Sequence, residues 1–212
     1  MQTTAQPHDV ASQLAEAPGM SAFKIKGVAY LGHLDYCRRF IPGGQEGFIH
    51  ALPESLRSFF EQQFLPGNWY DVFPLAASGF VCAELLQMPF YEFIRMRSTV
   101  QAKEDVKGVY RIFFAIFSTK SIAAKLPKLF FQYFNFGEIA LVKSETYWVE
   151  VARKGVPALL VNWQNGVLQG YLEVVLQMAG AKEPVIEFGE PQPTGMAGVH
   201  EIVTVPTTVT WT

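Results

Sequence analysis

Histidine, aspartate and cysteine occupy alternate positions near the start of the chain, in the stretch HLDYC that contains His33, Asp35 and Cys37. On a β-strand these side chains would share one face and form a plausible three-ligand metal group. On a helix, which the neighbouring Leu34 and the arginine pair at 38–39 allow, the three side chains do not converge. We favour the helix and therefore predict no metal site.

The chain has two cysteines, Cys37 and Cys82, which lie far apart in the sequence and outside any CxxC motif. This spacing indicates neither a disulfide framework nor a cysteine zinc site. We expect a reduced pair of thiols, as is typical of a cytoplasmic protein.

No sequence pattern brings a catalytic set together. Serine, histidine and acidic residues all occur, but no nucleophile elbow or other local signature relates them. The stretch GVLQG at 166–170 lacks the lysine of a P-loop and the third glycine of a dinucleotide fingerprint. We interpret it as a packing motif, in which Gly166 lets a helix start against a sheet and Gly170 allows close approach on the same side. We name no catalytic residue and predict that the protein is not an enzyme.

The charge and hydropathy of the chain argue against two classes of partner. The formal net charge is -2 and the isoelectric point is about 6.1, so the chain lacks the basic excess of proteins that bind nucleic acid or anionic lipid. No apolar run approaches the roughly 18 residues of a membrane-spanning helix. We expect no nucleic-acid partner and no membrane span.

The N-terminal segment has the composition of a tail. Residues 1–20 contain neither Lys nor Arg and no apolar run, so they lack the regions that define a signal peptide. We predict a disordered tail at 1–20 and a single domain at 21–212, in a cytoplasmic protein.

The N-terminal half has the hydrophobic pattern of a helical structure. We expect a short extended segment at 23–26 leading into a helix, and a turn at 41–44. Further helices are predicted after Pro53, between Trp69 and Leu86, and from 88 onward. Aromatic residues at helical spacing predict two more helices at 106–118 and 126–136.

From Gly137 the hydrophobic period changes from helical to alternating. We predict two strands within 138–155, a helix from Gly166 to about Ala179, a strand in KEPVIEF at 182–188, a loop at 189–198 and a last strand in VHEIVTV. The predicted fold class is α+β, with a helical N-terminal half packed on a small antiparallel sheet of strand–strand–helix–strand–strand order.

Several motifs resemble a known family. KGVAYLGHLDYCRRF, NWYDVFPLAASGF, YFNFGEIALV and GVLQGYLEVVLQMAGAK are together similar to a family of myxobacterial paralogues of about this length and unassigned function. That family resembles, more distantly, the haem NO/oxygen-binding domains, the 4-vinyl-reductase domains and subunits of the transport protein particle. The resemblance implies a helical N-terminal part and a small antiparallel sheet interrupted by a helix.

The resemblance raises the question of haem. In haem-binding members a Tyr-x-Ser-x-Arg-x-Gly segment holds the haem propionates, and residues 149–155 here keep Arg153 and Gly155 but lack the tyrosine and the serine. The axial ligand is normally a histidine from a helix between about 90 and 136, where this chain has none. Tyr110 or Tyr133 could ligate iron, but buried apolar tyrosines are far commoner than haem ligands. We predict no haem and no other cofactor.

Phenylalanines are concentrated between 113 and 136, where they could form ordinary core, line an apolar cavity or make an exposed dimer surface. We predict a non-enzymatic small-molecule sensor or regulatory domain, in which an apolar ligand occupies an aromatic pocket and an arginine anchors an acidic head group. The predicted ligand-binding residues are Tyr110, Phe113, Phe117, Phe130, Phe134 and Arg153. The alternative is an interaction or assembly module that dimerises through its apolar helices without a ligand, and a homodimer is the expected oligomeric state.

Overall fold

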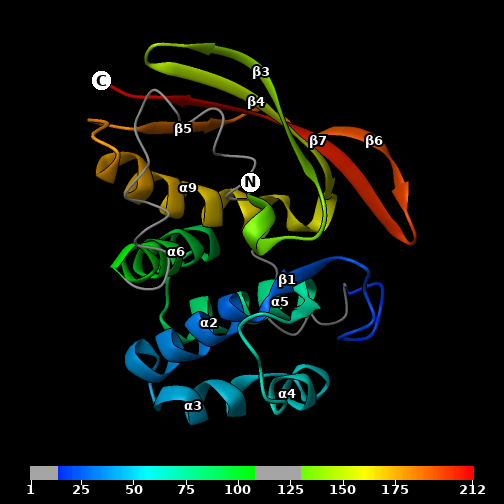
Figure 1. The fold of residues 1–212 in the computed structure, drawn as a ribbon. Coiled ribbons are helices and arrows are strands. Elements are labelled where there is room, and N and C mark those ends of the chain that lie inside the picture. The colour runs from blue at the N-terminus through cyan, green and yellow to red at the C-terminus, as the bar shows by residue number, and fades with distance from the viewer. Residues whose placement is uncertain (1–13, 108–129) are drawn as a thin grey trace. The chain divides into compact units, whose positions relative to one another are not determined.

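The computed structural model describes residues 14–107 and 130–212 of the chain. The chain divides into two compact units. Figure 1 colours the chain by residue number, from blue at the N-terminus to red at the C-terminus. The first unit comprises the residues up to Phe93 together with Tyr133–Asn135, and the second comprises Ile94–Gln132 and Phe136–Thr212. The prediction of a single domain at 21–212 stays a prediction, and the two units are described separately.

The first unit is helical, with one small sheet. Its elements are β1 (Lys24–Lys26), α2 (Gly27–Phe40), α3 (Gly44–Ala51), α4 (Glu54–Phe60), β2 (Trp69–Asp71) and α5 (Val72–Leu85). The extended segment that leads into a helix at the start of the chain is therefore confirmed. The helix predicted between Trp69 and Leu86 begins later than expected, because its first three residues pair with β1 as β2.

Asp71 explains where the strand β2 ends and α5 begins. Its side chain caps α5 by accepting a hydrogen bond from the backbone N–H of Phe73, as acidic residues at this position commonly do. It also accepts from the backbone N–H groups of Gly19 and Ser21, so these two residues of the N-terminal segment are held to the unit. Burial raises the pKa of the Asp71 carboxyl, although these three backbone hydrogen bonds and the charge of Lys24 act in the opposite direction.

Aromatic rings fill the core of the first unit. The buried ring of Tyr30 stacks on Phe64 with 4.3 Å between centroids, and Phe60 packs on Tyr30 at 5.5 Å. The Tyr30 hydroxyl donates to the backbone carbonyl of Asp71 over 2.5 Å, which satisfies the one polar atom of the ring. Burial, followed by the nearby Asp71 charge, raises the pKa of Tyr30 well above its ordinary value.

The second unit is an antiparallel sheet with helices. Its elements are the greater part of α6 (Phe90–Lys107), β3 (Glu138–Glu145), β4 (Trp148–Pro157), a 3-10 turn (Ala158–Leu160), α9 (Val161–Met178), β5 (Val185–Phe188), β6 (Gln192–Ala197) and β7 (His200–Thr210). The strand order is β3-β4-β7-β5, and β6 pairs with β7 on the edge opposite β4, beyond the end of β5. In Figure 1 the helix α9 lies along the sheet, with α6 beyond it.

The strand β6 corrects one sequence prediction. Residues 189–198 were expected to form a loop because they are rich in proline and glycine, yet Gln192–Ala197 pair with β7. Pro193 has no N–H to donate, which an edge strand tolerates. Gly195 has a φ of 144° at the register shift beside Pro193, where a bulge suits glycine. The same residues that indicate a loop therefore also suit a bulged edge strand.

The helix α9 corrects a second prediction and refines a third. It begins at Val161, so Gly166 lies inside the helix and does not start it. Gly170 does provide close packing, but against α6: a Cβ at this position would lie 2.1 Å from the carbonyl oxygen of Arg95. The contact is completed by a bidentate ion pair between the Arg95 guanidinium and Glu173.

The predicted fold class is confirmed as α+β, with a helical N-terminal region followed by an antiparallel sheet that a helix interrupts. The expected order gains one strand, β6. The helix predicted at 106–118 lies almost wholly outside the described residues, and the described part of the helix predicted at 126–136 is helical at 130–133. Across residues 14–107 and 130–212, no single helix is both long and apolar enough to cross a bilayer, although α5 and α6 together meet that test as a bent pair.

Candidate functional site

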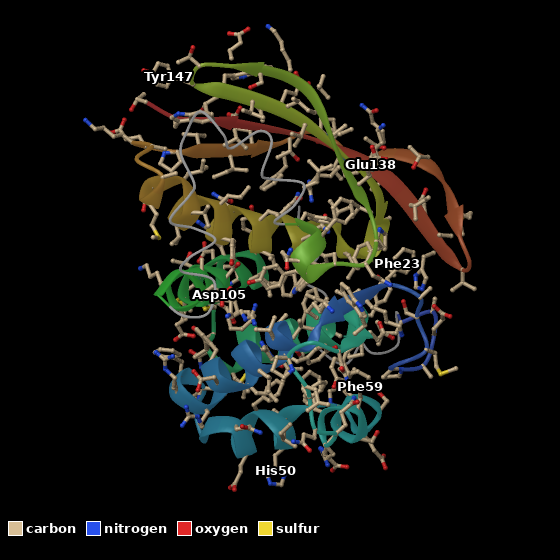
Figure 2. All side chains as sticks on the ribbon, viewed as in Figure 1. Phe23, His50, Phe59, Asp105, Glu138 and Tyr147 are labelled. Carbon is tan, nitrogen blue, oxygen red and sulfur yellow. The ribbon has the colours of Figure 1, made fainter. Side chains whose placement is uncertain are left out.

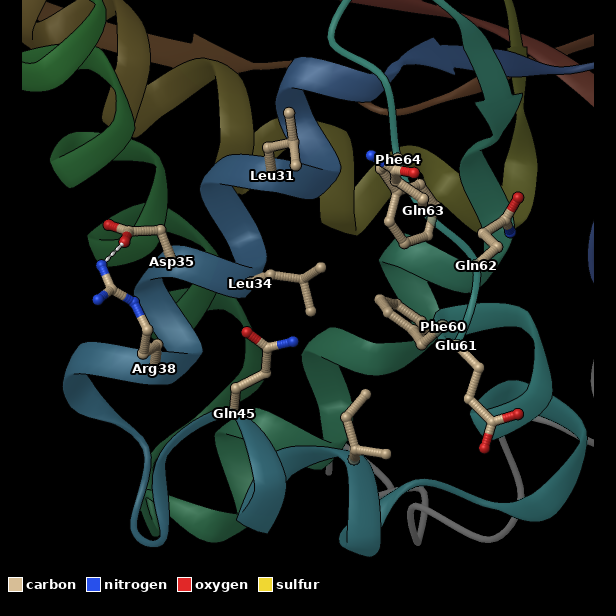
Figure 3. Close-up of a pocket in the computed structure, with 11 residues that line it drawn as sticks. Leu31, Leu34, Asp35, Arg38, Gln45, Phe60, Glu61, Gln62, Gln63 and Phe64 are labelled. Atoms are coloured by element: carbon tan, nitrogen blue, oxygen red, sulfur yellow. Dashed lines mark hydrogen bonds and ion pairs between the residues drawn. The ribbon is translucent and has the colours of Figure 1, made fainter.

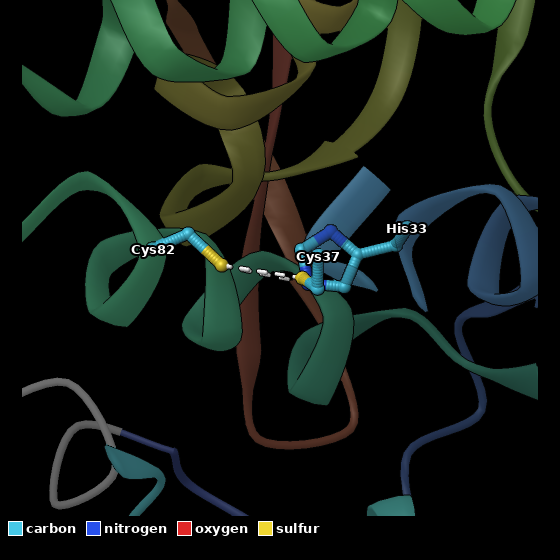
Figure 4. A group of neighbouring side chains, drawn as sticks. All are labelled: His33, Cys37 and Cys82. Atoms are coloured by element: carbon cyan, nitrogen blue, oxygen red, sulfur yellow. Dashed lines mark hydrogen bonds between the residues drawn. The ribbon is translucent and has the colours of Figure 1, made fainter. Parts of the chain in front are cut away.

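Three potential metal ligands converge in the core of the first unit. His33 and Cys37 come from α2 and Cys82 from α5, and Figure 4 shows the three side chains pointing toward one another. The two Sγ atoms are 3.7 Å apart, and the Nε2 atom of His33 lies 3.7 Å from the Cys37 sulfur and 3.9 Å from the Cys82 sulfur. His33, Asp35 and Cys37 were not expected to form a metal site. The structure brings together a different set of three, in which Cys82 takes the place of Asp35.

The helical geometry of α2 decides which side chains meet. His33 and Cys37 are four residues apart and so share a face of the helix. Asp35 points elsewhere, where its carboxylate pairs with Arg38 and, at 3.0 Å, with Arg39. Hydrogen bonds from Arg38 and Arg39 lower the pKa of the Asp35 carboxyl, with Arg38 contributing most. The expectation that His33, Asp35 and Cys37 do not converge on a helix is confirmed.

Sequence reasoning missed Cys82 as a partner of this set. Nothing in the spacing of Cys37 and Cys82 reveals that α5 packs against α2. The spacing of His33 and Cys37 was a usable signal, since His-x3-Cys on a helix places both side chains on one face.

The surroundings of the three side chains are closed to solvent. His33 is 2% exposed, and both cysteines are fully buried. Ser78, also fully buried, lies with its Oγ 3.1 Å from His33 Nε2 and donates to the backbone carbonyl of Leu75 over 2.8 Å. We call His33, Cys37, Cys82 and Ser78 the thiol–imidazole cluster.

A surface groove of about 550 Å³ lies beside this cluster in the first unit. Its walls come from α2, α3, the end of α4 and the segment that follows α4, and Figure 3 shows Leu34 and Phe60 projecting into it. Phe60 also packs on the His33 ring, with 6.3 Å between centroids. Phe60 is therefore a neighbour of both the groove and the thiol–imidazole cluster. The groove carries Asp35 and Arg38 at its rim, paired with each other.

A second buried polar set lies in the second unit, around Arg153 of β4. Its Nε donates to the hydroxyl of Thr207 over 3.0 Å, one terminal nitrogen donates to Gln164 over 2.6 Å, and the other donates to Asn165. The guanidinium also lies 5.2 Å from the centre of the Phe188 ring, a cation–π distance. Arg153 is 1% exposed, so the guanidinium makes these contacts inside the protein.

One donor in this set has no partner among the described residues. The Nε2 of Gln164 is buried and makes no hydrogen bond there, while its Oε1 accepts from Arg153. Leaving a buried donor unpaired costs about 1–3 kcal/mol. An oxygen atom that accepted a hydrogen bond from Gln164 Nε2 would recover this energy.

The predicted ligand-binding residues fall in different parts of the chain. Tyr110, Phe113 and Phe117 lie outside the described residues. Phe130, in the second unit, is buried. A Cβ added at Gly137 would lie 3.4 Å from the Phe130 ring and 3.2 Å from the carbonyl oxygen of Lys154. Phe130 and Arg153 thus lie near the same end of the β3–β4 pair.

Phe134 belongs to the first unit, where it is buried and bridges to Ile25 of β1. The sequence singled out Arg153 as the anchor for an acidic head group, and its partners Gln164, Asn165 and Thr207 were not foreseen. The ligand-binding role of the six predicted residues stays a prediction.

Comparison with known proteins finds likeness at the level of the fold. No protein-family model and no curated protein sequence matches the chain. Among solved structures, a Cs H-NOX mutant containing 4-cyano-L-phenylalanine has a TM-score of 0.63 at 11% identity, over 88% of this chain and 96% of its own. An oxygen-binding H-NOX domain related to soluble guanylate cyclases has a TM-score of 0.59 at 12% identity, over 88% and 94%.

The unliganded Fe(II) H-NOX protein of K. algicida is similar to the same extent, with a TM-score of 0.58 at 10% identity over 88% of this chain and 96% of its own. The predicted resemblance to haem NO/oxygen-binding domains is therefore confirmed for the fold. The resemblances to myxobacterial paralogues and to 4-vinyl-reductase domains stay predictions.

The donor residues of this chain do not fit haem in the manner of those domains. Residues 90–136 contain no histidine. In the described part of the chain, His33 lies in the thiol–imidazole cluster, His200 is buried on β7, and His50 is at the surface of α3, where Figure 2 shows it pointing outward. Arg153, the remaining match to the propionate-binding segment, is bonded to three internal oxygens.

Proposed function

We propose that the chain is a cytoplasmic, non-enzymatic small-molecule sensor or regulatory domain that binds an apolar ligand rather than haem. The class of function is supported by the likeness of the fold to H-NOX domains, one of which is described as oxygen-binding. The replacement of haem is supported by the donor residues, which do not match those that haem requires.

The observation that carries ligand binding is the unpaired Nε2 of Gln164 beside Arg153. A buried donor next to a buried cation favours a ligand that ends in a carbonyl or carboxylate oxygen. Such an oxygen would accept from Gln164 and gain electrostatic attraction from Arg153. Asn165 and Thr207 keep Arg153 in place without the ligand, so the site is formed in advance.

The apolar part of the ligand is proposed to contact the aromatic residues predicted from the sequence. Phe130 supports this placement because it lies at the same end of the β3–β4 pair as Arg153. Tyr110, Phe113 and Phe117 are proposed as further contacts. A fatty acid or a similar amphipathic carboxylic acid has the required chemistry, an oxygen head group and an apolar body.

Native mass spectrometry of the purified chain tests the proposal. The expected result is a mass above that of the bare chain, which returns to the bare mass on denaturation, together with an absorption spectrum without a Soret band. The same preparation is then titrated with a fluorescent fatty acid. A bare mass combined with no saturable binding of the probe would refute the proposed function, and a Soret band would refute the absence of haem.

Gln164→Leu is the variant that tests the head-group contact. Leucine preserves most of the buried volume but removes the donor, and it also leaves one Arg153 nitrogen without its acceptor. We therefore expect weaker probe binding, by about tenfold for one lost hydrogen bond of about 1.4 kcal/mol. Gln177→Leu, at an exposed position of the same helix, is the control and should bind the probe as the natural chain does. Equal binding by both variants would place the ligand elsewhere.

An assembly module is retained as the second candidate because Phe131, a large apolar residue beside the buried Phe130, is 48% exposed. Its ring lies 6.0 Å from that of Phe130 in an edge-to-face contact. An exposed phenylalanine attached to a buried one favours a contact surface, and the proposed partner is a second copy of this chain.

A further inference from the structure

We propose that the thiol–imidazole cluster is a Zn²⁺ site, with His33 Nε2 and the sulfurs of Cys37 and Cys82 as its protein ligands. This inference concerns the first unit and does not depend on the ligand proposed for the second. No sequence motif marks the site, since one ligand comes from α5 and two come from α2.

The separations between the three atoms match tetrahedral coordination. Zinc–sulfur bonds of about 2.3 Å and zinc–nitrogen bonds of about 2.1 Å, meeting at the tetrahedral angle, place two sulfurs about 3.8 Å apart and sulfur and nitrogen about 3.6 Å apart. The observed sulfur–sulfur separation is 3.7 Å, and the two sulfur–nitrogen separations are 3.7 and 3.9 Å. The three donors therefore stand close to three corners of a tetrahedron around one ion.

The position of His33 distinguishes a metal site from a redox pair of thiols. A disulfide between Cys37 and Cys82 would need only the two sulfurs to approach each other. Here an imidazole nitrogen lies at a similar distance from both sulfurs, which a disulfide does not require. Two thiols and an imidazole around one point are the donor set that selects zinc among the divalent cations of the cell.

The charge balance is consistent with full burial. Zinc binding requires the two thiols to lose their protons, and two thiolates with one divalent cation have no net charge. Burial of Cys37, Cys82 and His33 away from solvent then leaves no uncompensated charge in the core. The ring of His33 is fixed by an edge-to-face contact with Phe48 at 5.2 Å, so the ligand is held in one orientation.

The fourth ligand is an oxygen atom, supplied by Ser78 or by water. The Oγ of Ser78 already lies 3.1 Å from His33 Nε2. Phe60 lines the groove of Figure 3 and also packs on the His33 ring, so the groove is the nearest described opening to the cluster on this side.

Cobalt substitution in the full-length chain tests the proposal. Protein purified under reducing conditions is depleted of metal with a chelator and titrated with Co²⁺, and then with Zn²⁺. We expect about one equivalent to bind, with thiolate-to-cobalt charge-transfer absorption in the near ultraviolet and strong visible bands from tetrahedral cobalt. Zinc should displace the cobalt and abolish both. Cobalt binding without the thiolate band, or no binding, would overturn the proposal.

Cys37→Ser and Cys82→Ser should each lose the thiolate signal and bind zinc at least 100-fold more weakly. The matched control is Val81→Ala, which alters a buried neighbour of Cys82 on the same helix without removing a ligand. The control should keep about one equivalent of cobalt with an unchanged spectrum. If the serine variants do not fold, alkylation of the natural chain decides: zinc should slow labelling of both thiols at least tenfold. Equal labelling rates, or oxidation to a disulfide that zinc does not prevent, would contradict a zinc site.

Discussion

Gly170 of α9 contacts the backbone of Arg95 so closely that no larger residue fits: a Cβ would lie 2.1 Å from the Arg95 carbonyl oxygen and 3.0 Å from the Thr99 hydroxyl. The Arg95 oxygen is backbone within α6, so the clash can be relieved only by separating the two helices. We expect Gly170→Ala to lower the free energy of unfolding by about 1–3 kcal/mol, the usual cost of overpacking, despite the better helix propensity of alanine. Chemical denaturation measures this change.

Gly67→Ala is the control for that experiment, since no atom lies within 4 Å of a Cβ at Gly67. Its effect should stay within about 0.5 kcal/mol, as for most surface substitutions. A Gly170→Ala chain as stable as the natural chain would show that α6 and α9 can move apart at no cost.

The same glycine illustrates how much the sequence could predict. Its role in close packing was predictable, because a glycine inside an apolar helical stripe has few other uses. The partner was not, since nothing local to GVLQG says whether a sheet or the backbone of α6 lies opposite. Likewise, the strand β7 was predictable from its alternation of apolar and polar residues. The strand β6 was not, because Pro193 and Gly195 are typical of loops and because β6 forms only by pairing with β7.

The thiol–imidazole cluster was beyond prediction for a related reason. The pair His33 and Cys37 is local and could be placed on one helix face from spacing alone. Cys82 joins them only because α5 packs against α2, and tertiary contacts between helices leave no signal in a single sequence. Arg153 is an intermediate case. Its match to the arginine of the propionate-binding segment could be seen in the sequence. Its three oxygen partners could not, because they come from α9 and β7.

Arg153→Met should destabilise the second unit strongly. Methionine keeps much of the side-chain volume, but the oxygens of Gln164, Asn165 and Thr207 lose their donor inside the protein. We expect the free energy of unfolding to fall by about 3 kcal/mol or more, because each unpaired buried group costs about 1–3 kcal/mol. Denaturation monitored by circular dichroism gives the value.

Arg38→Met is the control for the loss of a guanidinium. The Arg38 side chain is 66% exposed and pairs with Asp35 at the surface, so its removal should cost no more than about 1 kcal/mol. If the two methionine variants were equally stable, the buried hydrogen bonds of Arg153 would make no net contribution to the free energy of unfolding.

Asp71 should make stability depend on pH in the direction opposite to that of most carboxylates. Its pKa is raised in the folded chain by burial, so the folded state holds the proton more tightly than the unfolded state. The contribution to stability is therefore fully present below the unfolded pKa of about 3.9. It is lost as the pH rises through the folded pKa.

Asp71→Asn provides the reference for this measurement because asparagine does not titrate. The free energy of unfolding of the natural chain, minus that of the variant, should decrease as the pH rises from below about 3.9 and then become constant. Urea denaturation at a series of pH values gives the difference. A difference that increases with pH would mean that the hydrogen bonds from Gly19, Ser21 and Phe73 outweigh burial.

Phe131→Asp tests the proposed homodimer. Phe131 is about half exposed, so a charge there should split a dimer formed through this residue without unfolding the chain, as light scattering and circular dichroism would show. Phe134 is unsuitable for this purpose because it is buried. Leu159→Asp, at another exposed apolar residue, is the control and should leave the dimer intact. A natural chain that is monomeric at all concentrations tested would exclude this assembly.

Zinc should stabilise the folded chain in proportion to its free concentration, because the proposed ligands come from two helices that separate on unfolding. At free zinc about 100 times Kd, one bound ion stabilises by about 2.7 kcal/mol, which corresponds to a Tm about 5–10 °C higher for a chain of this size. Addition of a strong chelator should reverse the rise in the natural chain and in Val81→Ala. Cys82→Ser should show the same Tm with and without zinc, because the remaining thiol and imidazole cannot hold the ion in the core. An equal rise in Cys82→Ser would show that zinc stabilises the chain from another site.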